Sequence, residues 1–326
     1  MDRKRTLAAL ALSIATAFGA GIGGAGAPAV AGPSAPVLRE MRWIDPALPR
    51  ADIVRLMTTQ PAECLVIPAQ PAEVAKIAVG RAAFGSPLLL GGQAARAGVS
   101  CASCHRAGRG NPHFAFPGVS GGPGTADVTS SLFSSKRGDG TDNPRPIPDL
   151  VSDPAKIDRD PASPDLRRFI RGLVVEEFDG LEVNAAVLDG LAAYVRALGG
   201  ACGGAIAQTV THDAGTATAA VGAARLSLAV RDVPAAHLLI GAARSALGRI
   251  DERYVAVPGI ARRLGASDAR LQKAQATALT DPAGAVEALD RWAADFGRDV
   301  PVLRSTESRS LYAPAVLTKA LSGTRP

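Results

Sequence analysis

The residues Cys-Ala-Ser-Cys-His at positions 101–105 constrain this chain more than any other feature. On a short helical turn, the thiols of Cys101 and Cys104 and the imidazole of His105 would share one side of the backbone. Covalent attachment of a haem requires two thiols, one for each vinyl-derived carbon of the porphyrin, and an imidazole that reaches the iron. The motif occurs once, so it predicts one haem c, with His105 as the proximal iron ligand.

Other uses of two closely spaced cysteines fit the sequence less well. A structural zinc site commonly takes four ligands from two such pairs, whereas the remaining cysteines, Cys64 and Cys202, are single and far apart. A thioredoxin-like motif would be expected near a βαβ pattern, and the sequence shows none. Chance occurrence of a five-residue pattern is the remaining alternative.

The first residues have the form of a secretory signal peptide. Basic residues at 3–5 precede an apolar run over 7–18 and then small residues, which is the usual order in such a signal. Ala29 and Ala31 fit the small-x-small rule for cleavage, so we expect removal of 1–31. An uncleaved anchor is the alternative, but the run is shorter than the roughly 20 residues that span a bilayer. The expected location is the periplasm, with no transmembrane segment after cleavage.

The two cysteines outside the motif predict a structural disulfide. An exported chain folds in an oxidising compartment, where cysteines commonly pair. Cys64 and Cys202 are an even remainder there, and they bracket the proposed haem domain. We therefore expect a Cys64–Cys202 bond, with free thiols as the alternative.

The fold class predicted from the sequence is mainly α, with a cytochrome c-like haem domain followed by an antiparallel helical bundle. Apolar residues at three-and-four spacing predict helices within the haem domain, around a long loop rich in Gly and Pro, and the Ala- and Leu-rich C-terminal part reads as four or five amphipathic helices. The expected divisions are a signal peptide at 1–31, an extended lead-in at 32–64 with a short helical stretch near 50–59, the haem domain at 65–203 and the bundle at 204–326. The expected helices of the haem domain cover 73–84, 163–178 and 184–200.

The charge balance argues against a nucleic-acid partner. The formal net charge is +6, and loss of residues 1–31 would leave about +4. Aromatic residues make up only 4% of the chain, and they do not alternate with Lys or Arg runs, as a nucleic-acid surface would require. A redox partner protein is the partner that a haem protein of this kind implies.

The stretch "VGRAAFGSPLLLGGQAARAGVSCASCH" resembles the segment before the first haem motif of bacterial dihaem cytochrome c peroxidases and the related quinone-cofactor-maturing dihaem enzymes. "TADVTSSLFSSKRGDG" is similar to a later segment of that family, without its tryptophan, and "LAAYVRALGG" matches the closing helix of many cytochrome c domains. The resemblance covers roughly residues 73–200. The residues that take the family's places before the motif are Gly80, Arg81, Phe84, Ser86, Pro87 and Leu88.

This chain departs from that family in the number of haems. The family carries two haem domains, and its second haem passes electrons to the haem that reacts with peroxide. One Cys-x-x-Cys-His motif cannot repeat that internal relay. If this chain acts like the family, the resemblance implies that a separate protein donates the electrons.

The second axial position of the iron decides between electron transfer and reaction with a small molecule. All three methionines precede the motif, so the usual downstream methionine ligand is absent. His113 is the nearest candidate, and the family resemblance places a distal histidine in the corresponding loop, although further from the motif. The alternatives are a polar loop residue, an open iron, or ligation by Met57, His212, His237 or a tyrosine.

Two functions follow from these residues. The first is an exported c-type cytochrome that acts in electron transfer. The second is a peroxidase-type oxidoreductase with an external electron donor, for which His113, Asp139 or Asp142 would have to serve as the acid–base group. Haem propionates would pair with arginines near the motif, and Tyr194 is expected in the core of the closing helix. The candidate arginines are Arg106, Arg109 and Arg137.

Overall fold

The computed structural model describes residues 38–152, 157–199 and 203–323. Within them the chain is mainly helical, as the sequence predicts, with twelve α-helices and four strands of two or three residues. These described residues belong to one compact unit. The expected signal peptide lies outside the described residues.

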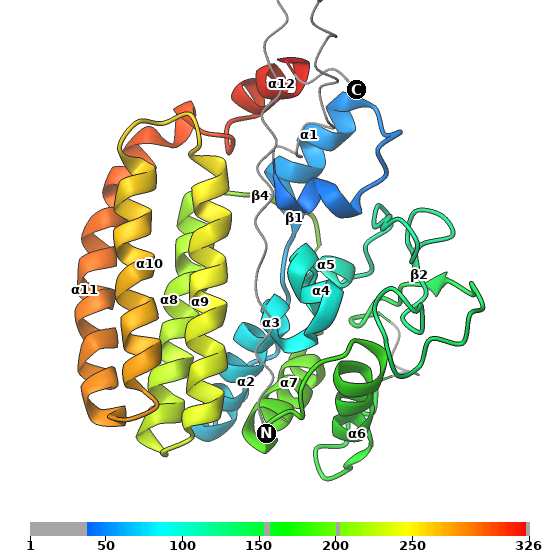
Figure 1. Cartoon of the computed structure of the whole chain (residues 1–326), viewed down its shortest axis with the longest axis horizontal. Coiled ribbons are helices and arrows are strands. Elements are labelled where there is room, and N and C mark those ends of the chain that lie inside the picture. The colour runs from blue at the N-terminus through cyan, green and yellow to red at the C-terminus, as the bar shows by residue number, and fades with distance from the viewer. Residues whose placement is uncertain (1–37, 153–156, 200–202, 324–326) are drawn as a thin grey trace, which may run out of the picture. The chain divides into compact units, whose positions relative to one another are not determined.

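The lead-in is more regular than the extended segment that we expected. A 3₁₀ turn, η1 (Arg39–Trp43), precedes helix α1 (Arg50–Thr58) and strand β1 (Thr59–Pro61), so the predicted short helical stretch forms. Strand β1 pairs antiparallel with β4 (Ala205–Ala207). Helix α1 packs on α12 (Pro314–Gly323), so the two ends of the described chain lie together (Figure 1).

Helices α2 (Pro71–Phe84) and α7 (Ala185–Ala197) cross at a contact between two glycines. A Cβ placed on Gly80 would lie 1.9 Å from the carbonyl oxygen of Gly190, so only a glycine allows this approach. Beside the crossing, the rings of Phe84 and Tyr194 have centroids 5.1 Å apart. The expected helix at 73–84 and the expected closing helix therefore pack directly on each other.

The segment between these two helices contains the motif and the long loop. Helices α3 (Pro87–Leu90), α4 (Gly92–Ala97) and α5 (Cys101–Cys104) lead into the turn η2 (Arg106–Gly108). The loop that follows carries the short strands β2 (Thr125–Ala126) and β3 (Arg145–Pro146). Aromatic side chains of this segment pack in a row, in which the ring of Phe133 lies between those of Phe116 and Phe178. Helix α6 (Asp165–Gly172) and a π-helical turn, η3 (Leu173–Glu177), end the segment.

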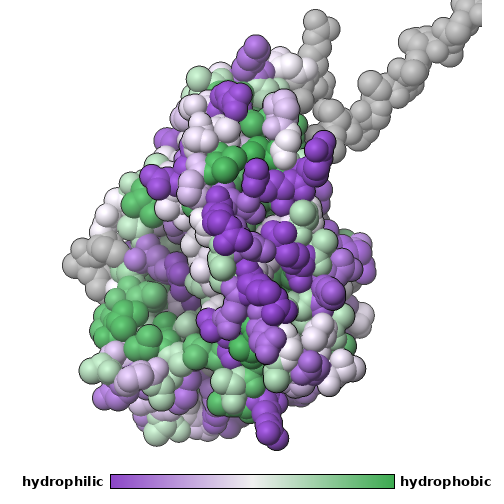
Figure 2. Space-filling model, turned by 90° about the vertical axis from the view of Figure 1, so that its left-hand side faces the viewer, coloured by the Kyte–Doolittle hydropathy of each residue, from purple (hydrophilic) through white to green (hydrophobic). Residues whose placement is uncertain are grey.

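Four long helices form an antiparallel bundle at the C-terminal side. They are α8 (Val210–Ala229), α9 (Val233–Arg253), α10 (Ile260–Thr277) and α11 (Pro282–Thr306), followed by the turn η4 (Glu307–Arg309). Successive helices pack together and α11 packs back on α8, which closes the bundle (Figure 1). The side chains of Thr209, Asp232 and Asp281 cap three of the N-termini. The face presented in Figure 2 is mixed, with hydrophilic residues along its middle and a hydrophobic patch toward the lower left.

The bundle and the motif-bearing segment share an interface. Helix α2 contacts both α8 and α9, and α3 also contacts α9. This interface places bundle side chains behind the Cys-x-x-Cys turn, as the site shows below. The domain boundaries expected near 65 and 204 stay predictions.

We expect Gly80→Ala to destabilise the protein. The added Cβ would clash with backbone atoms of α7, which do not move easily, and overpacking of this kind costs roughly 1–3 kcal/mol or more. The matched control is Gly222→Ala in α8, where a Cβ meets nothing within 4 Å. That change should stabilise the protein by roughly 0.5–1 kcal/mol, because glycine is costly within a helix. Denaturant unfolding checks both values, and equal effects at the two positions would contradict the close crossing.

Candidate functional site

The motif forms a single capped helical turn. Ser103 N–H donates to the carbonyl of Ser100 over 2.9 Å, and Ser100 N–H donates to Ser103 Oγ over 3.1 Å. His105 N–H then donates to the carbonyl of Cys101 over 2.8 Å. This turn is the arrangement that the sequence predicted for the two thiols and the imidazole. Both thiols are free.

The imidazole of His105 is held by one backbone carbonyl. Its Nδ1 lies 3.0 Å from the carbonyl oxygen of Pro148, and because a carbonyl only accepts, Nδ1 carries the proton. Burial lowers the pKa of His105 to about 4, so the ring is neutral at pH 7. Within the described residues Nε2 makes no hydrogen bond. A neutral imidazole fixed in this tautomer presents the Nε2 lone pair to a metal.

The two thiols and the imidazole are half-buried in the protein. Burial raises the pKa of Cys101 to about 12 and also raises the pKa of Cys104, so protein surrounds both. Yet Cys101, Cys104 and His105 keep accessible surface and are only half-buried. Two free thiols and a neutral imidazole held through Nδ1, all on one turn, are the protein groups that a covalently attached haem would need.

Protein side chains alone do not form a multidentate metal centre in the part of the chain that the structure describes. No group of three or more His, Cys, Asp or Glu residues converges there. Among these residues His105 would be the protein ligand that holds a haem iron, and Cys101 and Cys104 would hold the porphyrin. The described residues do not form the four-ligand set of a structural zinc site.

The turn is anchored to the lead-in from behind. The guanidinium of Arg106 donates to the carbonyls of Leu56 over 3.1 Å and Thr59 over 2.8 Å. The side-chain amide of Asn111 donates to the carbonyl of Ser103 over 2.9 Å. Between these anchors Ala107 has a left-handed backbone with φ of 51°. The fixed ends hold this strained residue in place.

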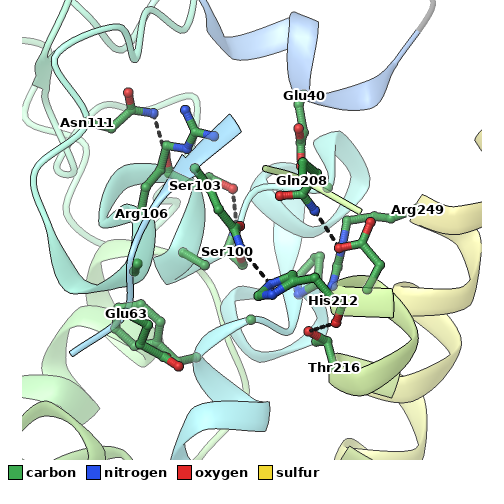
Figure 3. Close-up of a pocket in the computed structure, with 18 of the residues that line it drawn as sticks. Glu40, Glu63, Ser100, Ser103, Arg106, Asn111, Gln208, His212, Thr216 and Arg249 are labelled. Carbon is green, nitrogen blue, oxygen red and sulfur yellow. Dashed lines mark hydrogen bonds between the residues drawn. The ribbon is translucent and has the colours of Figure 1, made fainter. Parts of the chain in front are cut away.

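A cavity of about 270 Å³ lies behind the turn. Ala102 and Ser103, the residues between the two cysteines, line it, whereas Cys101, Cys104 and His105 do not. The cavity is therefore on the side of the turn opposite to the attachment side chains. Figure 3 shows residues of the motif region on one side of it and residues of the bundle, with His212 and Arg249, on the other.

The structure places His113 in the lining of this cavity. Burial lowers its pKa, with contributions from the charges of Arg55 and Arg106. Among the described residues no hydrogen bond, ring contact or shared cavity joins His113 to His105. Met57 and His212, two of the alternative ligands, also line the cavity behind the turn, and His237 is exposed on α9. None of them is brought to the attachment side, and the distal role of His113 stays a prediction.

The remaining candidate residues are either exposed aspartates or arginines that form ion pairs within the protein. Asp139 and Asp142 are exposed in the long loop, and Arg109 forms an ion pair with Asp149 over 3.5 Å. Arg137 pairs with two adjacent carboxylates, Glu176 and Glu177.

Tyr194 is buried, as expected. Its hydroxyl donates to Glu63 over 2.7 Å. Nothing in the local sequence predicts that bond, because Glu63 is distant along the chain and lies in the expected lead-in.

Cys64 is in a disulfide, while Cys101 and Cys104 are free. Its expected partner, Cys202, lies outside the described residues. The Cys64–Cys202 pairing therefore stays a prediction.

Glu177 is a polar group that the sequence reading missed. It ends the π-helical turn η3, and its Oε2 is buried without a hydrogen-bond partner among the described residues. Burial raises the pKa of Glu177, although Arg137 opposes this shift. The only signal in the sequence was an acidic pair directly after an apolar run, which is common at helix ends.

Comparison with known proteins finds no relatives. No family model matches the chain, and neither a curated protein nor a solved structure is significantly similar to it. A search of the described helices finds none with the length and hydropathy needed to cross a membrane.

We expect Arg106→Ala to lower the free energy of unfolding by about 3 kcal/mol, because two hydrogen bonds from a charged donor are lost. Arg106→Lys should lose roughly half as much, since an ammonium group can still reach one carbonyl. The control is Arg96→Ala, an exposed arginine that bonds only Gln93, with an effect within about 0.5 kcal/mol. Denaturant unfolding gives all three values, and a neutral Arg106→Ala would show that the anchor contributes nothing.

The raised pKa of Glu177 predicts a pH-dependent benefit from Glu177→Gln. The folded protein resists ionisation of this carboxyl, so Glu177 destabilises the fold as pH rises above its ordinary value of 4.5. Relative to wild type, the glutamine variant should be more stable at about pH 7.5 than at about pH 4. Glu182→Gln is the control with opposite sign, because Arg171 lowers the pKa of Glu182. The same pH trend in both variants would contradict the assignment.

Proposed function

We propose that this chain is an exported c-type cytochrome that carries one covalently bound haem and transfers single electrons to or from a partner protein. The proposed haem domain is cytochrome c-like, with the crossed helices α2 and α7 enclosing the motif segment. Export rests on the signal-like residues 1–31, and the expected location is the periplasm.

The state of His105 carries the proposal. The Pro148 carbonyl fixes the proton on Nδ1 and leaves Nε2 without a partner among the described residues. The neighbouring thiols of Cys101 and Cys104 are free and, like His105, half-buried. Two thiols and one directed imidazole on a single turn match what haem attachment needs.

Each of these residues has a distinct task. Cys101 and Cys104 would anchor the porphyrin by thioether bonds, and His105 would be the proximal ligand. The hydrogen bond to Pro148 orients the ring and makes Nε2 a better donor, while burial prevents protonation from competing with the metal. The ring of Phe84, 6.4 Å from the imidazole, restricts the movement of the ring. The haem itself supplies an iron that exchanges one electron.

Electron transfer requires fewer groups around the haem than peroxidase activity does. A peroxidase needs an acid–base group beside the reacting face of the haem. Of the three candidates, Asp139 and Asp142 are exposed loop residues and His113 lies in the cavity behind the turn. No contact in the described residues favours the peroxidase reading, which stays the alternative, with an external donor.

The test is expression of the full chain together with a cytochrome c maturation system. We expect one haem per chain that survives denaturation, and a pyridine haemochrome spectrum typical of two thioether bonds. Cys101→Ser with Cys104→Ser should abolish covalent haem, and His105→Ala should abolish the native spectrum of the ferric protein. His237→Ala is the matched control and should change neither. A chain that binds no haem in this system would overturn the proposal.

The spectrum also separates the two functions. We expect a low-spin ferric spectrum that peroxide and cyanide do not change. A high-spin spectrum that shifts on addition of peroxide would replace electron transfer by the peroxidase alternative. The His113→Ala variant tests the predicted distal role of His113, and an unchanged spectrum would assign the distal position to another group. A change of spin state in that variant would instead identify it as the distal ligand.

A further inference from the structure

We propose that the cavity behind the Cys-x-x-Cys turn binds a small organic anion, a carboxylate with an apolar body, at the guanidinium of Arg249. The site does not involve the attachment side chains. The inference therefore stands independently of the haem proposal.

Three parts of the chain line the cavity. The lead-in contributes Trp43 and Met57, the motif segment contributes Phe84 and Ala102, and the bundle contributes Arg249, among other residues. Its volume of about 270 Å³ approaches the lower end of ordinary small-molecule pockets, which begin at roughly 300 Å³. The size suits a small ligand of one ring or a short chain.

Most charged groups of the lining already have a partner, either in the lining or just outside it, as Glu40 has in Arg253 at 3.6 Å. Arg39 donates to Glu252 over 2.5 Å, and Arg81 donates to Glu63 over 2.7 Å. A third carboxylate, Asp213, accepts from the Tyr312 hydroxyl over 2.6 Å. The charge of Arg249 acts to lower the pKa of Asp213 against the larger effect of burial, but no hydrogen bond or ion pair joins these two side chains.

Arg249 is the exception. Its guanidinium makes no hydrogen bond or ion pair with the described residues, although α9 holds it half-buried at the cavity. Arg106, the other lining arginine without a carboxylate partner, donates to two carbonyls and keeps its charge. The lining therefore has an excess of positive charge and unused N–H donors.

These features select an organic anion. A partly desolvated guanidinium gains most from a carboxylate, which matches it in charge and planar geometry. The walls near it include large apolar side chains, such as Trp43, Leu56 and Phe84, which favour an apolar body over an inorganic ion. On the bundle side, Figure 3 draws Arg249 together with His212 and Gln208, whose side chains are engaged by Gln60 and Asp213.

The test is isothermal titration of the full chain, as purified from the maturation system, with benzoate, neutral benzamide and inorganic phosphate. We expect benzoate to bind at least about tenfold more tightly than benzamide and phosphate. Arg249→Gln should reduce benzoate to the level of benzamide. Ala219→Leu, which fills the lining from α8, should weaken benzoate and benzamide together.

The control is Arg225→Gln, an arginine of α8 that pairs with Asp290 over 2.6 Å and does not line the cavity. It should bind benzoate like the wild type. Circular dichroism and the melting temperature verify that all variants fold. Equal binding of benzoate and benzamide, tighter binding of phosphate, unchanged binding by Arg249→Gln, or no binding of benzoate would each overturn the proposal. A chain that binds benzoate without haem would leave this inference intact while removing the proposed function.

Discussion

Helix α2 packs both on α7 and on the C-terminal bundle, so it connects the two parts of the structure. On one side its Gly80 lies against the backbone of α7, and on the other side it packs on α8 and α9 of the bundle. Its last turn carries Phe84, which contacts both Tyr194 and His105. Helix α2 therefore combines a small residue, Gly80, at its close crossing with an aromatic residue, Phe84, in its last turn. Because close packing transmits strain, a change at this crossing would move the attachment turn as well as the bundle.

The second constraint is the electrostatic state of the attachment turn. The structure buries a histidine and two cysteines, which alone would cost free energy by desolvation, and it holds all three groups neutral. One hydrogen bond, from His105 to Pro148, settles the tautomer. A haem bound as proposed would form bonds with all three of these groups.

Polar contacts around the cavity connect the lead-in and the bundle to the motif segment. Ion pairs such as Arg81–Glu63 and hydrogen bonds such as Tyr194–Glu63 link elements that are far apart in sequence. Burying such a network is costly unless each member has a partner. Within the described residues the guanidinium of Arg249 makes no hydrogen bond or ion pair, and the Oε2 atom of Glu177 is buried without a hydrogen-bond partner. They lie in different regions, and only Arg249 lines the cavity.

The sequence by itself determined the local features. The Cys-x-x-Cys-His motif predicted the short helical turn, the three-and-four spacing of apolar residues located α2, α7 and the later bundle helices, and Gly–Pro density located the long loop, whereas α8, in a stretch that reads as a Thr- and Gly-rich linker, was missed. These features depend on residues that are close to one another in the sequence. Only the tertiary structure decided that Pro148, 43 residues after His105, holds the imidazole, that His113 lies behind the turn, and that Arg249 faces a cavity. Such contacts depend on how separate elements pack, which no local pattern encodes.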